Sequence, residues 1–157
     1  MNTFSSIIRF AATGAIIASS FAAKASSIEP TANSKALVSF ENYFGNATQV
    51  KWFTIGTDKL EAKFMVNNVS ETAFFDTRGN LLEVTRPIQV SDLPIQISLE
   101  MTREFPSSAV RYATEFSSGN STVYVLILES SSDWKTVRVN NNKDFTLIND
   151  LKKIFIR

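Results

Sequence analysis

An alternation of apolar and polar residues, repeated along most of the chain, constrains the fold more than any other feature of the sequence. In the run from Leu60 to Val66, for example, every second residue is apolar. Successive side chains of a β-strand point to opposite faces of a sheet, so this period of two predicts strands with one buried face. Short segments of turn-forming residues separate the runs, which favours antiparallel pairing. We expect strands that start near Thr48, Leu60, Val69, Leu81, Val110, Thr122, Trp134 and Phe145.

Three of the connections have the composition of tight turns. Gly56-Thr57-Asp58 and Asn140-Asn141-Asn142-Lys143 each lie between two predicted strands. In Asp76-Thr77-Arg78-Gly79-Asn80, Gly79 can adopt a positive φ and Asp76 can bond to the backbone ahead of it. These segments predict hairpins.

The segment after residue 32 has helical spacing instead. Asn33 is a typical N-cap residue, Leu37, Phe40 and Phe44 fall on one predicted face, and Gly45 follows as a stop signal. We therefore predict a first helix over residues 34–44.

A second helix is predicted between Ser91 and Pro106, although this segment has two interpretations. Ile97, Met101 and Phe105 share a helical face. The apolar residues from Leu93 to Met101 also alternate as in a strand, but Pro94 and the charged end of the segment favour the helix.

The order of elements predicts one α+β domain over residues 33–157, in which two helix-then-meander units form one antiparallel sheet backed by two helices. The units are 33–90 and 91–157, and residues 26–32 are predicted to be a flexible leader.

Residues 1–25 have the three zones of a secretory signal: a basic start with Arg9, an apolar run, and Ala23-Lys24-Ala25 before Ser26. The apolar run is shorter than the roughly 20 residues that span a bilayer. We predict cleavage after Ala25, export to the periplasm or the cell exterior, and no membrane span in the mature chain.

The composition excludes several kinds of chemistry. The chain has no His and no Cys, which removes Ser-His and Cys-His nucleophile pairs, imidazole or thiolate zinc sites and thiol redox reactions. Cleavage leaves 14 basic against 15 acidic residues, a balance that gives no reason to expect nucleic acid as a partner. No phosphate-binding glycine loop and no EF-hand loop is present. We therefore assign no catalytic, cofactor-binding or metal-binding residue.

Three aromatic residues on predicted strands, Trp52, Tyr112 and Trp134, are candidates for a partner-binding surface. Two helices can cover one face of an open sheet, and an aromatic patch on the other face would indicate a partner. In the alternative interpretation, Trp52 and Tyr112 occupy matching places in the two units and pack against the helices.

Several segments resemble the PepSY-like, β-lactamase-inhibitor-like family of secreted proteins found in Bacteroidota. They are Tyr43-Phe44, Val50-Lys51-Trp52, Leu60-Glu61-Ala62-Lys63-Phe64, Phe75-Asp76-Thr77-Arg78-Gly79-Asn80-Leu81 and Asp92-Leu93-Pro94. The second half departs more from the family pattern, since residues 140–143 lack the Asp-x-x-Gly turn. The resemblance implies an α+β fold of helix and meander units, a location outside the cytoplasm and no known enzymatic activity.

These observations favour a non-catalytic binding module whose partner is another envelope protein. One alternative is an inhibitor of an envelope peptidase or β-lactamase. The other is a small hydrolase that uses a pair of carboxylates, which a pair of facing carboxyl groups in a pocket would indicate.

Overall fold

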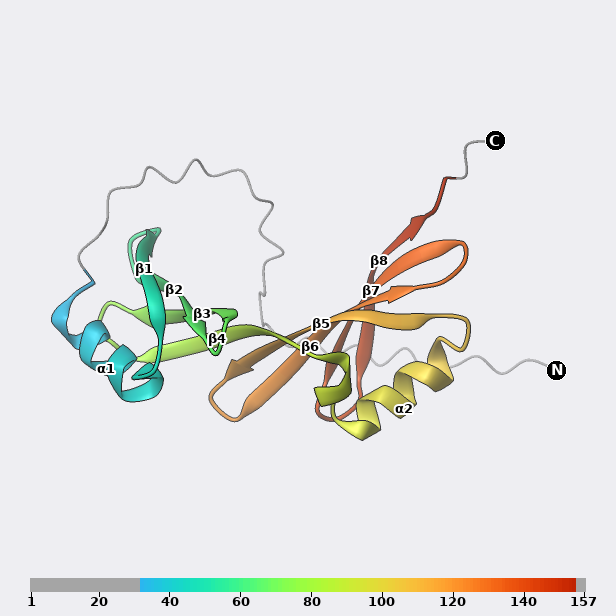
Figure 1. Ribbon diagram of the computed structural model, residues 1–157, viewed down its shortest axis with the longest axis horizontal. Coiled ribbons are helices and arrows are strands. Elements are labelled where there is room, and N and C mark those ends of the chain that lie inside the picture. The colour runs from blue at the N-terminus through green and yellow to red at the C-terminus, as the bar shows by residue number, and fades with distance from the viewer. Residues whose placement is uncertain (1–31, 155–157) are drawn as a thin grey trace.

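The computed structural model describes residues 32–154, which form one eight-stranded antiparallel sheet with two α-helices (Figure 1). The strands lie in the sheet in chain order, from β1 at one edge to β8 at the other. The predicted α+β class and antiparallel sheet are therefore confirmed, while the predicted signal and cleavage site lie outside the described residues. The elements are α1 (Ser34–Phe44), β1 (Thr48–Ile55), β2 (Lys59–Val66), β3 (Val69–Asp76), β4 (Leu81–Ile88), the 3-10 helix η1 (Val90–Asp92), α2 (Ile95–Glu104), β5 (Ala109–Ser118), β6 (Ser121–Glu129), β7 (Asp133–Asn140) and β8 (Phe145–Lys152).

Helix α1 begins at the predicted residue. Asn33 keeps an extended backbone, and its side-chain oxygen accepts a hydrogen bond from the Ala36 amide at 2.9 Å. This contact satisfies one of the amides that a helix N-terminus leaves unpaired. Ala36 and Phe40 are buried and Phe44 packs beside them, whereas Leu37 is 42% exposed. The prediction that Leu37 faces the core is wrong, because the helix meets the sheet along the i, i+4 row that starts at Ala36.

The segment with two interpretations is a helix. In α2, Ile97 and Met101 are buried one turn apart, and Phe105 packs against the same cluster just after the helix ends. Pro94 stands at the N-cap, where its missing N–H breaks no helical hydrogen bond.

Both helices cover the same face of the sheet. On β4, Val84 packs against the apolar cluster beneath α1, and Ile88 packs against the cluster beneath α2. The pairing from Val84 to Ile88 has no bulge, so two residues four apart point to the same side. We call this side the helix face and the opposite side the open face; no described helix lies on the open face.

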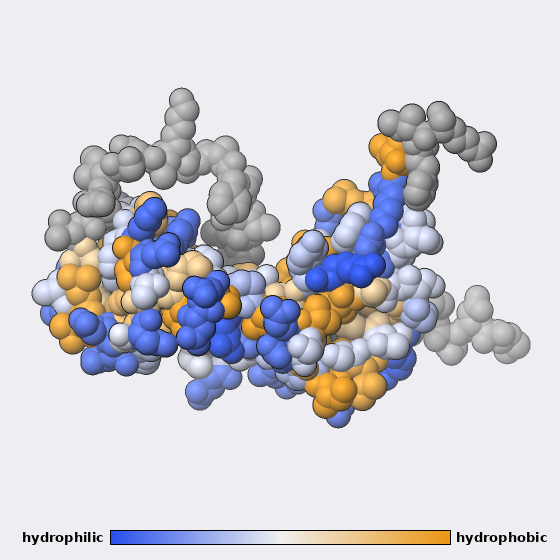
Figure 2. All heavy atoms as spheres, in the orientation of Figure 1, coloured by the Kyte–Doolittle hydropathy of each residue, from blue (hydrophilic) through white to orange (hydrophobic). Residues whose placement is uncertain are grey.

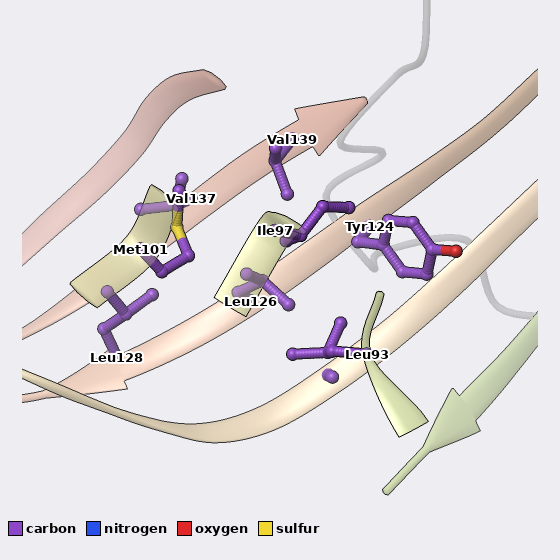
Figure 3. Packing of buried hydrophobic residues seen from close by; sticks show 9 residues of the cluster. Leu93, Ile97, Met101, Tyr124, Leu126, Leu128, Val137 and Val139 are labelled. Carbon is purple, nitrogen blue, oxygen red and sulfur yellow. The ribbon is translucent and has the colours of Figure 1, made fainter. Parts of the chain in front are cut away.

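Each helix has its own apolar cluster, and the two clusters share the helix face. The aromatic rings of Phe40 and Phe64 dominate the first, with centroids 4.9 Å apart. The first cluster comprises Ala36, Phe40, Leu60, Ala62, Phe64, Ala73 and Phe75. In the second, side chains of α2 point into the strands beneath (Figure 3). It comprises Leu93, Ile97, Met101, Ala113, Tyr124, Leu126, Leu128, Val137 and Val139.

The β3–β4 turn forms as predicted and fastens α1 to the sheet. Asp76 Oδ1 accepts hydrogen bonds from the amides of Arg78 at 2.9 Å and Asn80 at 2.8 Å. The Asn80 side-chain amide also donates to Asp76 Oδ2 at 2.8 Å, and this bond lowers the pKa of Asp76 most, followed by the bond from the Asn80 backbone amide. Gly79 has a φ of +88° and lies against the first turn of α1.

The β7–β8 turn has the same geometry, although its sequence departs from the family pattern. Asn140 Oδ1 accepts from the amides of Asn142 at 2.9 Å and Asp144 at 3.0 Å. Lys143 takes the place of the glycine, with a φ of +68°. In the β3–β4 turn the aspartate comes first and the asparagine last, whereas here Asn140 comes first and Asp144 last. The side-chain bond between the two ends is kept, since Asn140 Nδ2 donates to Asp144 Oδ2 at 3.2 Å.

Bulges in β1 and β5 interrupt the alternation, and the pairings of β3 with β4 and of β7 with β8 each contain one register shift as well. In β5, Val110 lies opposite Leu128 on the helix face, but Tyr112 lies opposite Ile127 on the open face. Arg111 is the extra residue, and it reverses the side to which the following residues point. The interpretation of Tyr112 as a core residue matching Trp52 is therefore wrong; Ala113 is the buried residue on this strand.

Candidate partner-binding surface

The structure brings together two of the three aromatic residues singled out in the sequence. Trp52 lies on the helix face, where its ring packs edge-on against Phe40 with centroids 5.4 Å apart. Tyr112 and Trp134 lie on the open face, as their pairing with Ile127 and Glu129 shows. Tyr112 is 66% exposed and Trp134 is half-buried. Trp52 therefore lies on the opposite face from the other two, and it is on edge strand β1, several strands away from β5 and β7.

Tyr112 and Trp134 belong to a larger apolar group on the open face. Ile127 lies opposite Tyr112 on the neighbouring strand, and Leu151 lies opposite Trp134. Ile127 and Trp134 occupy diagonal positions of β6 and β7, close enough for a large side chain to bridge. We call Tyr112, Ile127, Trp134 and Leu151 the open-face patch. Exposed aromatic and aliphatic side chains of this kind are characteristic of protein contact sites.

Charged side chains border the patch. Glu129, directly opposite Trp134, accepts a hydrogen bond from Arg111 Nε at 2.6 Å and another from Lys153 Nζ at 2.7 Å. The Lys153 ammonium also lies 5.1 Å from the centroid of the Trp134 ring, within the range of a cation–π contact. The indole ring of Trp134 thus has a charged neighbour.

The two cations keep Glu129 ionised. Hydrogen bonds from Lys153 and then Arg111 lower the pKa of Glu129, against the smaller opposing effect of burial. A carboxyl group with a lowered pKa is deprotonated at neutral pH, so Glu129 has no proton to donate as a general acid. Its role in this geometry is to position Arg111 and Lys153.

A shallow hollow of about 560 Å³ adjoins these charges, with an open mouth towards solvent. Its wall is mostly polar, and Glu129 is the one carboxylate among the residues that line it. They are Pro106, Ser107, Ser108, Ala109, Arg111, Glu129, Ser130, Ser131 and Lys153. The hollow therefore lacks the second carboxyl group that the hydrolase alternative requires.

A second charged group lies on the helix face, between the two apolar clusters. Arg86 Nε donates to Glu115 Oε1 at 2.9 Å. Burial raises the pKa of nearby Glu71, while the charge of Arg86 lowers it by a smaller amount. Neither Glu71 nor Glu115 lines the hollow. Within residues 32–154, no three acidic side chains converge in an arrangement that could hold a metal ion.

Sequence reasoning did not identify most of this surface. No feature of the sequence singled out Leu151, and Ile127 was one of several apolar residues in a continuous run. The ion pairs of Glu129 join residues 18 and 24 positions apart in the sequence. No local pattern could have shown this, because the contact depends on the pairing of β5 with β6 and on the path of the chain after β8.

Solved structures with the same fold come from Bacteroides species. A DUF2874 family protein from Bacteroides ovatus superposes with a TM-score of 0.62 at 12% identity, covering 78% of this chain and 89% of that chain. A BLIP-like protein from Bacteroides fragilis gives a TM-score of 0.59 at 16% identity over 75% and 84% of the two chains. A candidate periplasmic protein from Bacteroides eggerthii gives 0.61 at 10% identity over 78% and 90%. No family model and no curated protein matches the sequence.

At these identities the similarity shows a common fold. The expected β-lactamase-inhibitor-like architecture is thereby supported, whereas the relation to PepSY proteins stays a prediction. Within the described residues, no helix is long and apolar enough to cross a membrane.

Proposed function

We propose that this protein is a non-catalytic binding module of the periplasm or cell exterior that contacts a protein partner through the open-face patch. The supporting observation is Tyr112, which is 66% exposed on the same uncovered face as Trp134, with β6 between them. Aromatic residues and arginine contribute most of the binding energy in many protein interfaces, and Arg111 borders this patch. The sequence features of residues 1–25 and the fold shared with a candidate periplasmic protein support the location.

A pair of tyrosines tests the proposal. Tyr112 is 66% exposed on the open face and Tyr43 is 63% exposed on α1, so their replacement removes similar amounts of exposed surface. We expect Tyr112→Ala and Trp134→Ala to weaken capture of envelope proteins by the immobilised protein at least tenfold, the loss of a strong contact residue. Tyr43→Ala should leave capture unchanged. Equal capture by all four proteins would contradict the proposal.

Inhibition of an envelope peptidase or β-lactamase is a more specific form of the same function. The shared fold with a BLIP-like protein favours it. If the open-face patch blocks an enzyme, the wild-type protein should lower the activity of at least one envelope hydrolase in a panel, and Tyr112→Ala should restore it. A panel without inhibition would leave binding without inhibition as the function.

A further inference from the structure

Each edge strand of the sheet carries one bulge. β1 carries a bulge between Thr48 and Lys51, with Gln49 at a φ of +55°, and such a bulge disturbs pairing with another strand. The bulge of β8 is at Ile148, because Thr136 pairs with Asn149 and Val137 pairs with Leu147. After it, β8 pairs regularly with β7 from Asn149 to Lys152, and no described residue pairs with the outer side of this segment. Every residue of β8 is exposed, and Figure 2 shows both hydrophilic and apolar residues at the raised end of the molecule where β8 lies.

The orientation of the peptide groups shows which residues of β8 can bond outwards. The Lys153 amide donates to the Ser132 carbonyl at 2.8 Å, towards β7. Successive residues of an antiparallel strand bond alternately to the two sides. Asp150 and Lys152 therefore direct their N–H and C=O groups away from β7, where they can pair with a strand of another chain.

The side chains of β8 complement a second copy of the same strand. If two antiparallel β8 strands meet with Leu151 on the two-fold axis, Asp150 of each copy lies opposite Lys152 of the other. Opposite charges in directly paired positions stabilise a sheet, and like charges destabilise it. The sequence of β8 therefore favours this register of self-pairing.

The charges of β7 extend this pattern. Within one chain, Lys152 lies opposite Asp133 and Asp150 lies opposite Lys135. Across the axis, four side chains would therefore form one row: Asp133 and Lys152 of one copy, followed by Asp150 and Lys135 of the second copy. The sign of the charge would alternate along this row. On the open face, the two Leu151 side chains would meet and join the two Trp134 rings into one apolar row.

We propose that the protein forms a two-fold dimer in which β8 pairs with β8 of a second copy, centred on Leu151. The two sheets then continue across the axis as one sheet, and the exposed β8 edge of each copy becomes paired. The dimer and the patch share Leu151, but Tyr112 lies three strands from this edge and takes no part in the pairing. The oligomeric state therefore tests the dimer, and the Tyr112→Ala variant tests the partner proposed for the patch.

The oligomeric state of the full protein tests the pairing directly. Sedimentation velocity at concentrations from about 1 to about 200 μM should show a monomer–dimer equilibrium, the range in which a small interface associates. Leu151→Lys places two like charges on the axis and should raise the dissociation constant at least tenfold. Leu99→Lys is the control, since Leu99 on α2 is 58% exposed and Leu151 is 57% exposed. A wild-type protein that stays monomeric at every concentration would overturn the proposal. This is the result expected if the natural occupant of the β8 edge is a different protein.

The register can be tested by a disulfide, because the chain has no cysteine of its own. The two Leu151 residues would form a non-hydrogen-bonded pair with Cα atoms about 4.5 Å apart, which suits a disulfide. Leu151→Cys should therefore oxidise to a covalent dimer much faster than Leu99→Cys. Equal rates for the two variants would exclude this register.

Charge reversal provides a test that separates pairing from stability. Asp150→Lys and Lys152→Asp should each weaken the dimer, because each variant places like charges opposite each other. An equimolar mixture of the two restores both opposite-charge pairs, so a heterodimer should form on mixing. Circular dichroism of each variant checks that it folds. Two folded variants that stay monomeric when mixed would count against the proposed pairing.

Discussion

Asp133 is a buried carboxylate at the start of β7 that three side chains hold in its ionised form. Its oxygens accept hydrogen bonds from Ser130 Oγ at 2.7 Å and Lys152 Nζ at 3.2 Å, and Lys135 Nζ lies 2.8 Å away. The contact with Lys135, followed by that with Ser130, lowers the pKa of Asp133 far below its usual range. The side chain therefore links β7 to β8 at the end of the sheet next to the open-face patch.

Asp133→Asn should destabilise the protein at neutral pH and less so in acid. A carboxyl group whose pKa is lower in the folded state contributes stability above its unfolded pKa of about 3.9, and this contribution is lost as the pH falls towards the folded pKa. We expect the melting temperature of the variant to lie below that of the wild type at pH 7, with a smaller gap at pH 3. Thermal unfolding followed by circular dichroism measures both.

Asp58→Asn is the control for this change. Asp58 lies in the exposed turn between β1 and β2, and its carboxylate forms no ion pair within residues 32–154. Its replacement should leave the melting temperature nearly unchanged at both pH values. A constant gap between Asp133→Asn and the wild type from pH 7 to pH 3 would show that the ionised carboxylate is not the source of the stability.

At the scale of elements, the β3–β4 turn holds α1 by close contact between backbones. A Cβ atom on Gly79 would lie 2.7 Å from the Lys35 carbonyl carbon and 2.9 Å from the Ala36 nitrogen. Atoms at these distances overlap, and the backbone of a helix N-terminus cannot move away as a flexible side chain can. The glycine is required here for space as well as for its positive φ.

Gly79→Ala should therefore cost more stability than the same change at a glycine with free space. Gly56 and Gly119 have φ values of +62° and +55°, with no atom within 4 Å of an added Cβ. Alanine at these two positions should cost about 1–2 kcal/mol from backbone strain alone. Gly79→Ala should exceed that cost by at least about 1 kcal/mol, since strain and displacement add. Urea unfolding measures the stability of the three variants. Equal losses of stability would mean that α1 moves away from the added Cβ atom at no cost in free energy.

The sequence was sufficient to predict most helices and strands, but not to predict to which face of the sheet each side chain points. Alternation and turn composition predicted all eight strands, and Asn33 indicated where α1 starts. The extra residue Arg111 has no composition that indicates a bulge, and Tyr112 was consequently placed on the wrong side in one of the two interpretations. The pairing of β4 with β5, which joins the two halves, depends on tertiary packing that no local pattern encodes.

At the scale of the whole molecule, two helix-and-strand halves share one sheet but have separate apolar clusters. Each half has about 60 residues, a size at which a single core is only marginally stable. Five residue pairs between β4 and β5, from Val84 to Ile88 on β4, and the Arg86–Glu115 ion pair connect the halves. We infer that neither half persists when the other unfolds, so the molecule should unfold in one cooperative transition.

The two tryptophans provide one fluorescent probe in each half, because Trp52 packs against the first cluster and Trp134 lies on β7. Trp134→Phe leaves Trp52 as the reporter, and Trp52→Phe leaves Trp134. Phe75 is fully buried in the first cluster, and Phe75→Ala should remove about 3–5 kcal/mol. In urea unfolding, this change should lower the midpoint reported by Trp134 as much as that reported by Trp52. If only the midpoint reported by Trp52 moves, the two halves unfold independently. Each half would then be stable without the other, which would contradict the inferred cooperative transition.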